Sequence, residues 1–301
     1  MNPKQQLQAL AQARRGVIVP GAFNAMSAQV IADLGFEAIY VTGAGVTNMW
    51  LGMPDQGFMG LTDMANHTAR IRDAVELPLL VDADTGFGNA VNTYHTVRTL
   101  ERAGADCIQL EDQVNPKRCG HFSGKDVIST EEMLGKIKAA VDARRDAGTL
   151  IMARTDAAAV HGFDAAVERA QRFEEAGADI LFVEAVTSTQ QIRSLPQRLH
   201  RPQLINMVLG GKTPIASADE LGAWALALCC MPTQPCKAPS PGCKNASPNC
   251  ATTTKCRKTR TSWPRSQNAN GWSTSHSGTR WSVAMRPQRA CRPLPAPDNL
   301  R

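Results

Sequence analysis

The residues most suggestive of chemistry are Asp82 and Asp84, which end an apolar run at residues 77–84. If this run is a β-strand, the alternation of side chains puts both carboxylates on one side. Two carboxylates at short range repel each other unless a cation lies between them, and oxygen ligands with open positions suit Mg²⁺ or Mn²⁺. The pair therefore predicts a divalent metal site, and the capping of a following helix is the alternative role for one carboxylate.

A second candidate group is the sequence KRCGH at residues 117–121, in a loop expected directly after a strand. The two cations and the histidine that flank Cys119 are expected to lower the pKa of its thiol. A thiol with a lowered pKa can act as an acid or a base in catalysis. By contrast, Cys107 begins an apolar run, and we interpret it as an inert core residue.

Arg154 lies near the end of another apolar run, residues 149–156. A guanidinium at a buried strand end is suited to bidentate binding of a carboxylate. The alternative is an ion pair between Arg154 and a neighbouring acid of the protein.

Three segments share one pattern, in which a helix-like stretch ends at a glycine and a short apolar run follows. The glycines are Gly35, Gly104 and Gly177, each placed where a helix commonly ends on a left-handed residue. Apolar runs that alternate with helices are typical of parallel strands buried on both faces. Further strand candidates are residues 17–21, 77–84, 149–156 and 203–208, with an eighth strand beginning at 225–228. We therefore predict an α/β protein with a (β/α)8 TIM-type barrel rather than an open doubly wound sheet.

Polar side chains lie at the ends of these expected strands. A (β/α)8 barrel gathers the carboxyl ends of all its strands on one face, and that face carries the chemistry. Helix capping is the alternative role for any single one of these side chains. The residues expected on the face are Thr42, Asp82, Asp84, Glu111, Arg154, Asp156, Glu184 and Asn206.

The composition changes abruptly near Leu228. Residues 229–301 contain seven of the nine cysteines, ten of the 18 prolines and only three Val, Ile or Leu residues. They carry 12 Lys and Arg against one acid, which gives this segment a net charge of about +11 and leaves about −5 for residues 1–228. We predict a barrel catalytic domain at 1–228 and a disordered or frameshifted tail at 229–301.

Several classes of protein are disfavoured by the sequence. No apolar run approaches the ~20 residues of a membrane span, and no signal peptide is evident at the N-terminus. The two cysteines of residues 1–228 favour a reducing, cytoplasmic location. The glycine-rich turns lack the third glycine of a dinucleotide fingerprint, and the basic tail has no periodicity typical of nucleic-acid binding.

Taken together, the motifs resemble the isocitrate lyase / phosphoenolpyruvate mutase superfamily over about residues 5–228. The KRCGH string favours the lyase branch, which contains methylisocitrate lyase and dimethylmalate lyase. The resemblance implies a barrel and, where the C-terminus is intact, a homotetramer. The matching strings are YVTGAG (40–45), LGMPD (51–55), VDADTGFG (81–88), EDQ (111–113), KRCGH (117–121), MARTDA (152–157) and INMVLGGKTP (205–214).

The resemblance implies a role for each matching site residue. The Mg²⁺ site comprises Asp82, Asp84 and Glu111. The catalytic group comprises Cys119 as proton donor or acceptor, Tyr40 and Asp55 near the reacting hydroxyl, and Arg154 on a substrate carboxylate. The residues expected to bind substrate are Thr42, Gly43, Ala44, Gly120, His121, Arg154, Glu184, Asn206, Met207 and Val208.

The reaction implied is the retro-aldol cleavage of a small 2-hydroxy di- or tricarboxylate of the methylisocitrate or dimethylmalate type. Its products are an α-keto acid such as pyruvate and a second carboxylate. An oxaloacetate decarboxylase or a phosphonate-type mutase of the same fold, and an inactive frameshifted remnant, are the alternatives. Thr42 and Ala44 stand where methylisocitrate lyases have Ser and Gly, so the resemblance leaves the substrate open.

The tail lacks the turn and long helices with which the family continues after the eighth strand. We hypothesise a frameshift near Cys229, and we expect the eighth strand and the C-terminal helices to be lost or scrambled. A barrel without its eighth strand has an open edge, and open sheet edges favour aggregation. A genuine disordered tail is the alternative.

The frameshift hypothesis predicts what the gene itself contains. Sequencing from the codon for Trp224 to the stop codon is expected to reveal a second reading frame. Near Met231 that frame encodes Tyr-Ala-Asn-Ala-Ala-Leu, followed by a helix-like sequence, because one permitted set of codons for residues 231–236 reads so one base earlier. A shifted frame that encodes no such continuation contradicts the hypothesis.

Overall fold

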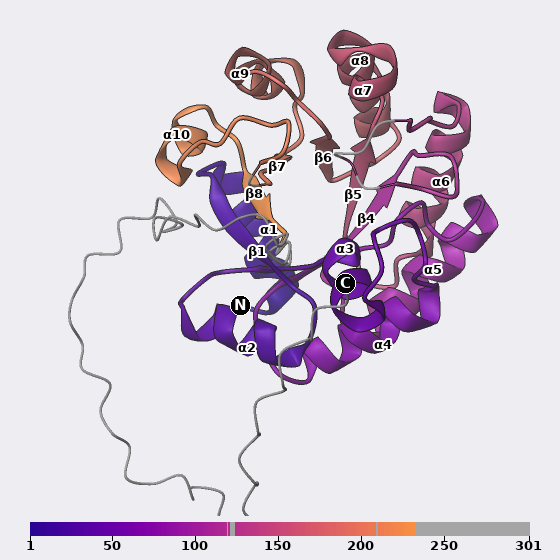
Figure 1. Ribbon diagram of the computed structural model, residues 1–301, viewed down its shortest axis with the longest axis vertical. Coiled ribbons are helices and arrows are strands. Elements are labelled where there is room, and N and C mark those ends of the chain that lie inside the picture. The colour runs from indigo at the N-terminus through magenta and orange to yellow at the C-terminus, as the bar shows by residue number, and fades with distance from the viewer. Residues whose placement is uncertain (119, 121–123, 209, 233–301) are drawn as a thin grey trace, which may run out of the picture. The chain divides into compact units, whose positions relative to one another are not determined.

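The computed structural model describes residues 1–118, 120, 124–208 and 210–232 of the chain. Eight parallel strands form one closed barrel in sequence order, as Figure 1 shows. The predicted (β/α)8 barrel is thereby confirmed. The strands are β1 (Val17–Ala22), β2 (Ile39–Val41), β3 (Leu79–Asp82), β4 (Cys107–Glu111), β5 (Leu150–Thr155), β6 (Ile180–Val183), β7 (Gln203–Asn206) and β8 (Leu228–Met231).

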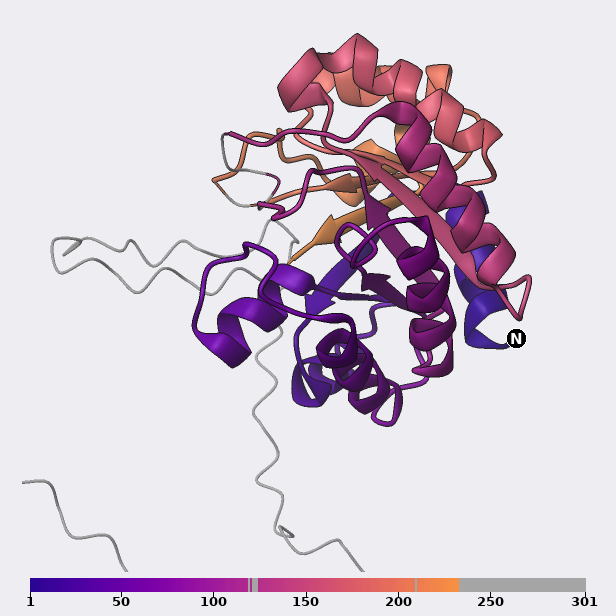
Figure 2. The same cartoon turned by 90° about the vertical axis from the view of Figure 1, so that its right-hand side faces the viewer.

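Helices surround the barrel and connect its successive strands (Figure 1). In Figure 2 the strand arrows point toward the end of the barrel where α3 lies, and the N-terminus lies at the opposite end. The helices are α1 (Pro3–Ala13), α2 (Ala25–Asp33), α3 (Gly43–Val46), the π-helix η1 (Thr47–Leu51), α4 (Leu61–Arg72), α5 (Ala90–Arg102), α6 (Thr130–Ala143), α7 (Ala158–His161), α8 (Phe163–Glu175), α9 (Thr189–Arg198) and α10 (Ala218–Ala223).

The recurring glycines end helices and start the turns that lead into the next strand. Gly35, Gly104 and Gly177 have φ angles of 80°, 96° and 103°, in the left-handed region that glycine adopts without steric cost. In each case the N–H of the following residue donates to the carbonyl five residues earlier, which closes the helix end. The pattern predicted from the sequence is therefore the local geometry found.

The apolar core has two layers. One lies between the outer face of the barrel and the helices, and the other fills the barrel interior. At the N-terminal end of the barrel, Leu7 and Leu10 of α1 join the interior cluster, so that α1 covers this opening. The interior apolar cluster therefore fills the N-terminal half of the barrel. Polar residues lie at the opposite, carboxyl end.

Strand β8 closes the barrel, although we expected the eighth strand to be lost. It pairs with β7 on one side and with β1 on the other, and Leu228, Cys229 and Cys230 are at most 2% exposed. The expectation was wrong because ladder hydrogen bonds come from the backbone, and cysteine packs as a small apolar side chain. The strand extends past the boundary expected at Leu228, and residues 233–301 lie outside the described residues.

No helix among the described residues is both long and apolar enough to cross a membrane.

If β8 is an integral part of the fold, shortening a buried side chain on it will destabilise the protein. Leu228→Ala is expected to lower the free energy of unfolding by about 2–5 kcal/mol, because Leu228 is fully buried in the barrel interior. The measurement is urea denaturation followed by circular dichroism. Leu34→Ala is the matched control, because Leu34 is 70% exposed and its truncation leaves no cavity. Equal midpoints for the two variants would contradict the closed barrel.

Candidate active site

The interior side chains of strands β4, β5 and β6 change from apolar to charged toward the carboxyl end of the barrel. On β5, Leu150 and Met152 belong to the interior apolar cluster and Arg154 follows at the next interior position. Strands β4 and β6 lead in the same way to Glu111 and Glu184, and all three charged residues are at most 7% exposed. The carboxyl end of the barrel is therefore a buried ring of charge above an apolar floor.

The two aspartates of the DAD sequence converge, but by a different route from the one expected. Strand β3 ends at Asp82, and Asp84 lies beyond it in a turn with a φ angle of 46°. Asp82 Oδ1 accepts hydrogen bonds from the Asp84 backbone at 3.1 Å and from Gln109 Nε2 at 2.9 Å. A Cβ atom placed on Gly43 would lie 3.1 Å from Asp82 Oδ2 and 3.4 Å from Asp84 Oδ1. A single position beside Gly43 therefore lies within 3.4 Å of an oxygen of each carboxylate.

Lys117 bridges two carboxylates that lie far apart in the sequence. Its Nζ is 2.6 Å from Asp55 Oδ1 and 2.7 Å from Asp84 Oδ1, and the lysine is 4% exposed. Burial raises the pKa of Asp84 to about 6, against the opposing effect of the Lys117 ammonium. Burial would lower the pKa of Lys117, but Asp84 and the other nearby carboxylates raise it well above its usual value.

Arg154 is held by three acids of the protein. Its Nε lies 2.9 Å from Asp156 Oδ2 and 3.2 Å from Glu111 Oε2, and its Nη2 lies 3.4 Å from Glu184 Oε2. Its guanidinium carbon lies 5.2 Å from the centroid of the Phe182 ring. The ion pair that we considered as the alternative for Arg154 is therefore present, and it fixes the direction of the guanidinium.

Negative charge exceeds positive charge in this buried ring. Six carboxylates face three cations among the described residues, and Glu111 Oε1 and Asn206 Oδ1 are buried with no hydrogen-bond partner there. Burial raises the pKa of Glu111 well above its usual value, only partly offset by Arg154. The carboxylates are Asp55, Asp82, Asp84, Glu111, Asp156 and Glu184, and the cations are Lys117, Lys125 and Arg154.

This arrangement fits a divalent cation. The described residues contain no group of three or more His, Cys, Asp and Glu side chains arranged to hold a metal. Mg²⁺, however, commonly binds through one or two carboxylates and keeps several waters. The convergent oxygens of Asp82 and Asp84 would supply two such ligands, and Glu111 Oε1, which has no hydrogen-bond partner among the described residues, would accept from a metal-bound water.

Tyr40 lies below the charged ring, on β2. Its hydroxyl donates to Gln109 Oε1 at 2.8 Å, and Gln109 in turn donates to Asp82. Burial, followed by the charge of Asp82, raises the pKa of Tyr40 well above its usual value. The hydroxyl therefore supports Asp82 through the Gln109 side chain.

The remaining substrate-binding candidates take several positions. Thr42 caps α3 by accepting the N–H of Gly45, and Gly43 and Ala44 form the first turn of that helix. Asn206 donates to Glu184 Oε2 at 3.1 Å, at the rim of the ring. Met207 packs in the layer between barrel and helices, and Val208 follows it as a buried residue. Cys119 and His121 lie outside the described residues.

Three residues of the site, Lys117, Gln109 and Lys125, were not predicted from the sequence. Lys117 was noted only as a charge near Cys119, Gln109 was treated as part of an apolar strand, and Lys125 was not assigned at all. A signal existed for Gln109, because a glutamine at an interior strand position requires a hydrogen-bond partner. For the two lysines, the loop sequence gives no indication of which acids their side chains reach.

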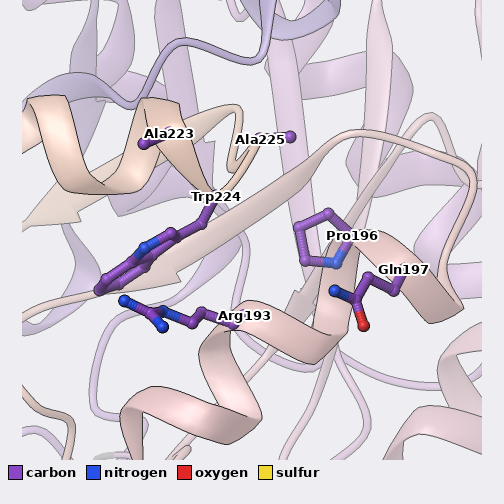
Figure 3. Close-up of a pocket in the computed structure, with 6 residues that line it drawn as sticks. All are labelled: Arg193, Pro196, Gln197, Ala223, Trp224 and Ala225. Atoms are coloured by element: carbon purple, nitrogen blue, oxygen red, sulfur yellow. The ribbon is translucent and has the colours of Figure 1, made fainter.

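A separate surface pocket lies between α9 and the end of α10. Figure 3 shows Arg193 stacked against Trp224, and the guanidinium carbon lies 4.7 Å from the centroid of the indole. The pocket is also lined by Pro196, Gln197 and Ala225, and no residue of the charged ring lines it. We therefore place the candidate active site at the ring and not at this pocket.

The raised pKa of Asp84 makes a prediction for the stability of the metal-free protein. A carboxyl whose folded-state pKa of about 6 exceeds its unfolded value of 3.8 stabilises the fold only while it is protonated. Stability is therefore lost as the pH rises from about 4 to 6, by about 3 kcal/mol in total. We expect Asp84→Asn to be more stable than the wild type at pH 8 in EDTA, and to show little gain at pH 4.

Asp142→Asn is the matched control, because Asp142 is an exposed residue of α6. Chemical denaturation at both pH values measures the difference. An equal gain in stability for Asp84→Asn at pH 4 and at pH 8 would show that burial does not disfavour the ionised form of Asp84.

The part of the chain that forms the barrel is similar in sequence to known proteins. A family profile described as phosphoenolpyruvate phosphomutase matches residues 7–240. A 2,3-dimethylmalate lyase from Eubacterium barkeri is 46% identical over 77% of this chain and 81% of its own length. A 2-methylisocitrate lyase from Aeropyrum pernix is 51% identical over 72% of this chain and 70% of its own.

Solved structures of relatives have the same fold. A crystal structure of 2,3-dimethylmalate lyase, described as a PEP mutase/isocitrate lyase superfamily member, matches with a TM-score of 0.73 and 34% identity, over 76% of this chain and 78% of its own. Phosphonopyruvate hydrolase, in a complex with oxalate and Mg²⁺, matches with a TM-score of 0.67 and 29% identity, over 76% of this chain and 80% of its own. The chain therefore belongs to the isocitrate lyase / phosphoenolpyruvate mutase superfamily, and within it to the lyases that both sequence relatives represent.

Proposed function

We propose that the protein is a Mg²⁺-dependent carbon–carbon lyase that cleaves a small 2-hydroxy di- or tricarboxylate of the methylisocitrate or dimethylmalate type. The observation that carries this proposal is the excess of carboxylates over cations in the charged ring. A ring with excess negative charge attracts a divalent cation, and the bound cation together with Arg154 would offset the charge of an anionic substrate. The products are an α-keto acid such as pyruvate and a second carboxylate.

Asp82 and Asp84 are the residues that would hold the ion, with Glu111 supporting its waters. When bound, Mg²⁺ supplies positive charge that stabilises the negative charge developing on the substrate oxygen. Mn²⁺ is the other ion that suits these oxygen ligands.

Arg154 binds and orients the substrate carboxylate. Its Nε and Nη2 edges already face protein acids, whereas Nη1 has no hydrogen-bond partner among the described residues. We therefore assign the Nη1 edge, which makes none of these contacts, to the substrate carboxylate. The backbone at Thr42, Gly43 and Ala44 contacts the keto-acid end of the substrate, as the family resemblance implies.

The chain's own groups move the two protons of the cleavage. We assign the Asp55 carboxylate, 2.6 Å from Lys117 Nζ, as the acceptor of the 2-hydroxyl proton. The C–O bond then becomes the carbonyl while the carbon–carbon bond breaks, and the electron pair stays on the departing carboxylate fragment. The Cys119 thiol, which the resemblance places on the loop after β4, donates a proton to that carbon.

The direct experiment is a substrate screen with the purified full-length chain. Methylisocitrate, isocitrate, dimethylmalate and oxaloacetate are each supplied with Mg²⁺, and the α-keto acid or oxalate released is identified by mass spectrometry. We expect cleavage of a branched 2-hydroxy acid, which EDTA abolishes and added Mg²⁺ restores. Release of product from oxaloacetate alone would instead favour the oxaloacetate-cleaving alternative.

Two variants separate binding from proton transfer. Arg154→Lys keeps the charge but loses the planar fork, so KM is expected to rise about tenfold with a smaller change in kcat. Cys119→Ser is expected to lower kcat about 100-fold or more with little change in KM, because a serine hydroxyl is a far weaker acid.

Arg201→Lys is the matched control, because Arg201 is exposed and remote from the charged ring. An unchanged kcat in Cys119→Ser would refute the assigned proton donor without refuting the metal site. The homotetramer that the resemblance implies for an intact C-terminus, and the cytoplasmic location that the cysteine content favours, are part of the same proposal. Size-exclusion chromatography tests the homotetramer.

A further inference from the structure

The loop after β4 is tied to the charged ring by one lysine. Lys125 Nζ donates to the Gly120 carbonyl at 2.6 Å and to Asp156 Oδ1 at 2.5 Å. Its side chain is 1% exposed and that of Asp156 is fully buried. A buried ammonium that makes two charge-assisted hydrogen bonds restrains both partners more strongly than a surface ion pair does.

Each partner of Lys125 contacts Arg154. Asp156 accepts from Arg154 Nε at 2.9 Å and from Nη2 at 3.2 Å. A Cβ atom on Gly120 would lie 2.7 Å from Arg154 Nη2 and 2.7 Å from Glu184 Oε2. The backbone at Gly120 therefore lies directly against the guanidinium, at a distance that only glycine permits.

The charge of Lys125 also affects Asp156. Burial by itself would raise the pKa of Asp156, but Arg154 and Lys125 together bring it below its usual value. With Lys125 present, Arg154 is not the sole counter-ion of this carboxylate. More of the guanidinium's positive charge is then available to a ligand.

We propose that Lys125 is a positioning residue, which seats the Gly120 backbone on Arg154 and shares the charge of Asp156, so that Arg154 binds a ligand carboxylate. Lys125 itself does not touch the ligand in this scheme. The inference rests on the proposed function only in taking Arg154 as the carboxylate-binding group. It adds a residue whose role neither the sequence motifs nor the reaction requires.

The test compares Lys125→Met, Lys125→Arg and the wild type. Methionine has an apolar side chain of similar length to that of lysine but no charge. Arginine keeps the charge and has donors for both the Gly120 carbonyl and Asp156 Oδ1. Lys138→Met is the matched control, because Lys138 is an exposed lysine of α6. Thermal unfolding of all four proteins shows whether each one is folded.

The first readout is hydrogen exchange of the full-length chain without ligand. In Lys125→Met we expect at least tenfold faster exchange in peptides that contain Gly120, and wild-type rates in Lys125→Arg. Unchanged exchange in Lys125→Met overturns the proposal, whether or not the protein has lyase activity.

The second readout is the affinity for oxalate in the presence of Mg²⁺, measured by titration calorimetry. We expect about tenfold weaker binding in Lys125→Met and binding within about threefold of the wild type in Lys125→Arg. Equal affinity in Lys125→Met and the wild type overturns the positioning role. If the wild type binds oxalate but cleaves no 2-hydroxy acid, the proposed function fails and the inference about Lys125 stands on its own result.

Discussion

The burial of more negative than positive charge at one end of the barrel is the constraint on which the rest of the structure depends. Arg154 is the centre of this arrangement, since three acids hold it and an aromatic ring lies beneath it. Unpaired buried charge costs several kcal/mol per ion, so the ring stays ionised only where cations and hydrogen bonds compensate. The fold provides that compensation from loops that the apolar core of the barrel holds in place.

The helix layer takes part in this compensation. Arg169 of α8 donates to Asp112 at 2.7 Å, and Asp112 accepts the Thr155 hydroxyl at 2.7 Å and the Asp156 backbone at 2.9 Å. The turn after β5 is therefore held from outside the barrel as well as from within. A supporting shell of this kind keeps Asp156 fixed, and Asp156 fixes Arg154.

Much of the fold follows from the sequence, because apolar runs, helix-ending glycines and their order are local signals. The convergence of Asp82 and Asp84 was also predicted, although a left-handed turn and not strand alternation brings Asp84 into place. Two features could not be predicted. The contacts of Lys117 depend on a long flexible side chain, and the closure by β8 depends on backbone pairing that an unusual Cys-rich sequence still supports.

The members of the charged ring are unevenly distributed around the barrel. Its described members come from strands β3 to β5 and from the segments that follow strands β2 to β6, and none comes from β1, β7 or β8. Strands β1 and β8 meet at the seam of the barrel, where described side chains pack in the apolar interior and the two backbones pair. All described members of the charged ring precede residue 185, so they lie upstream of the change in composition near Leu228.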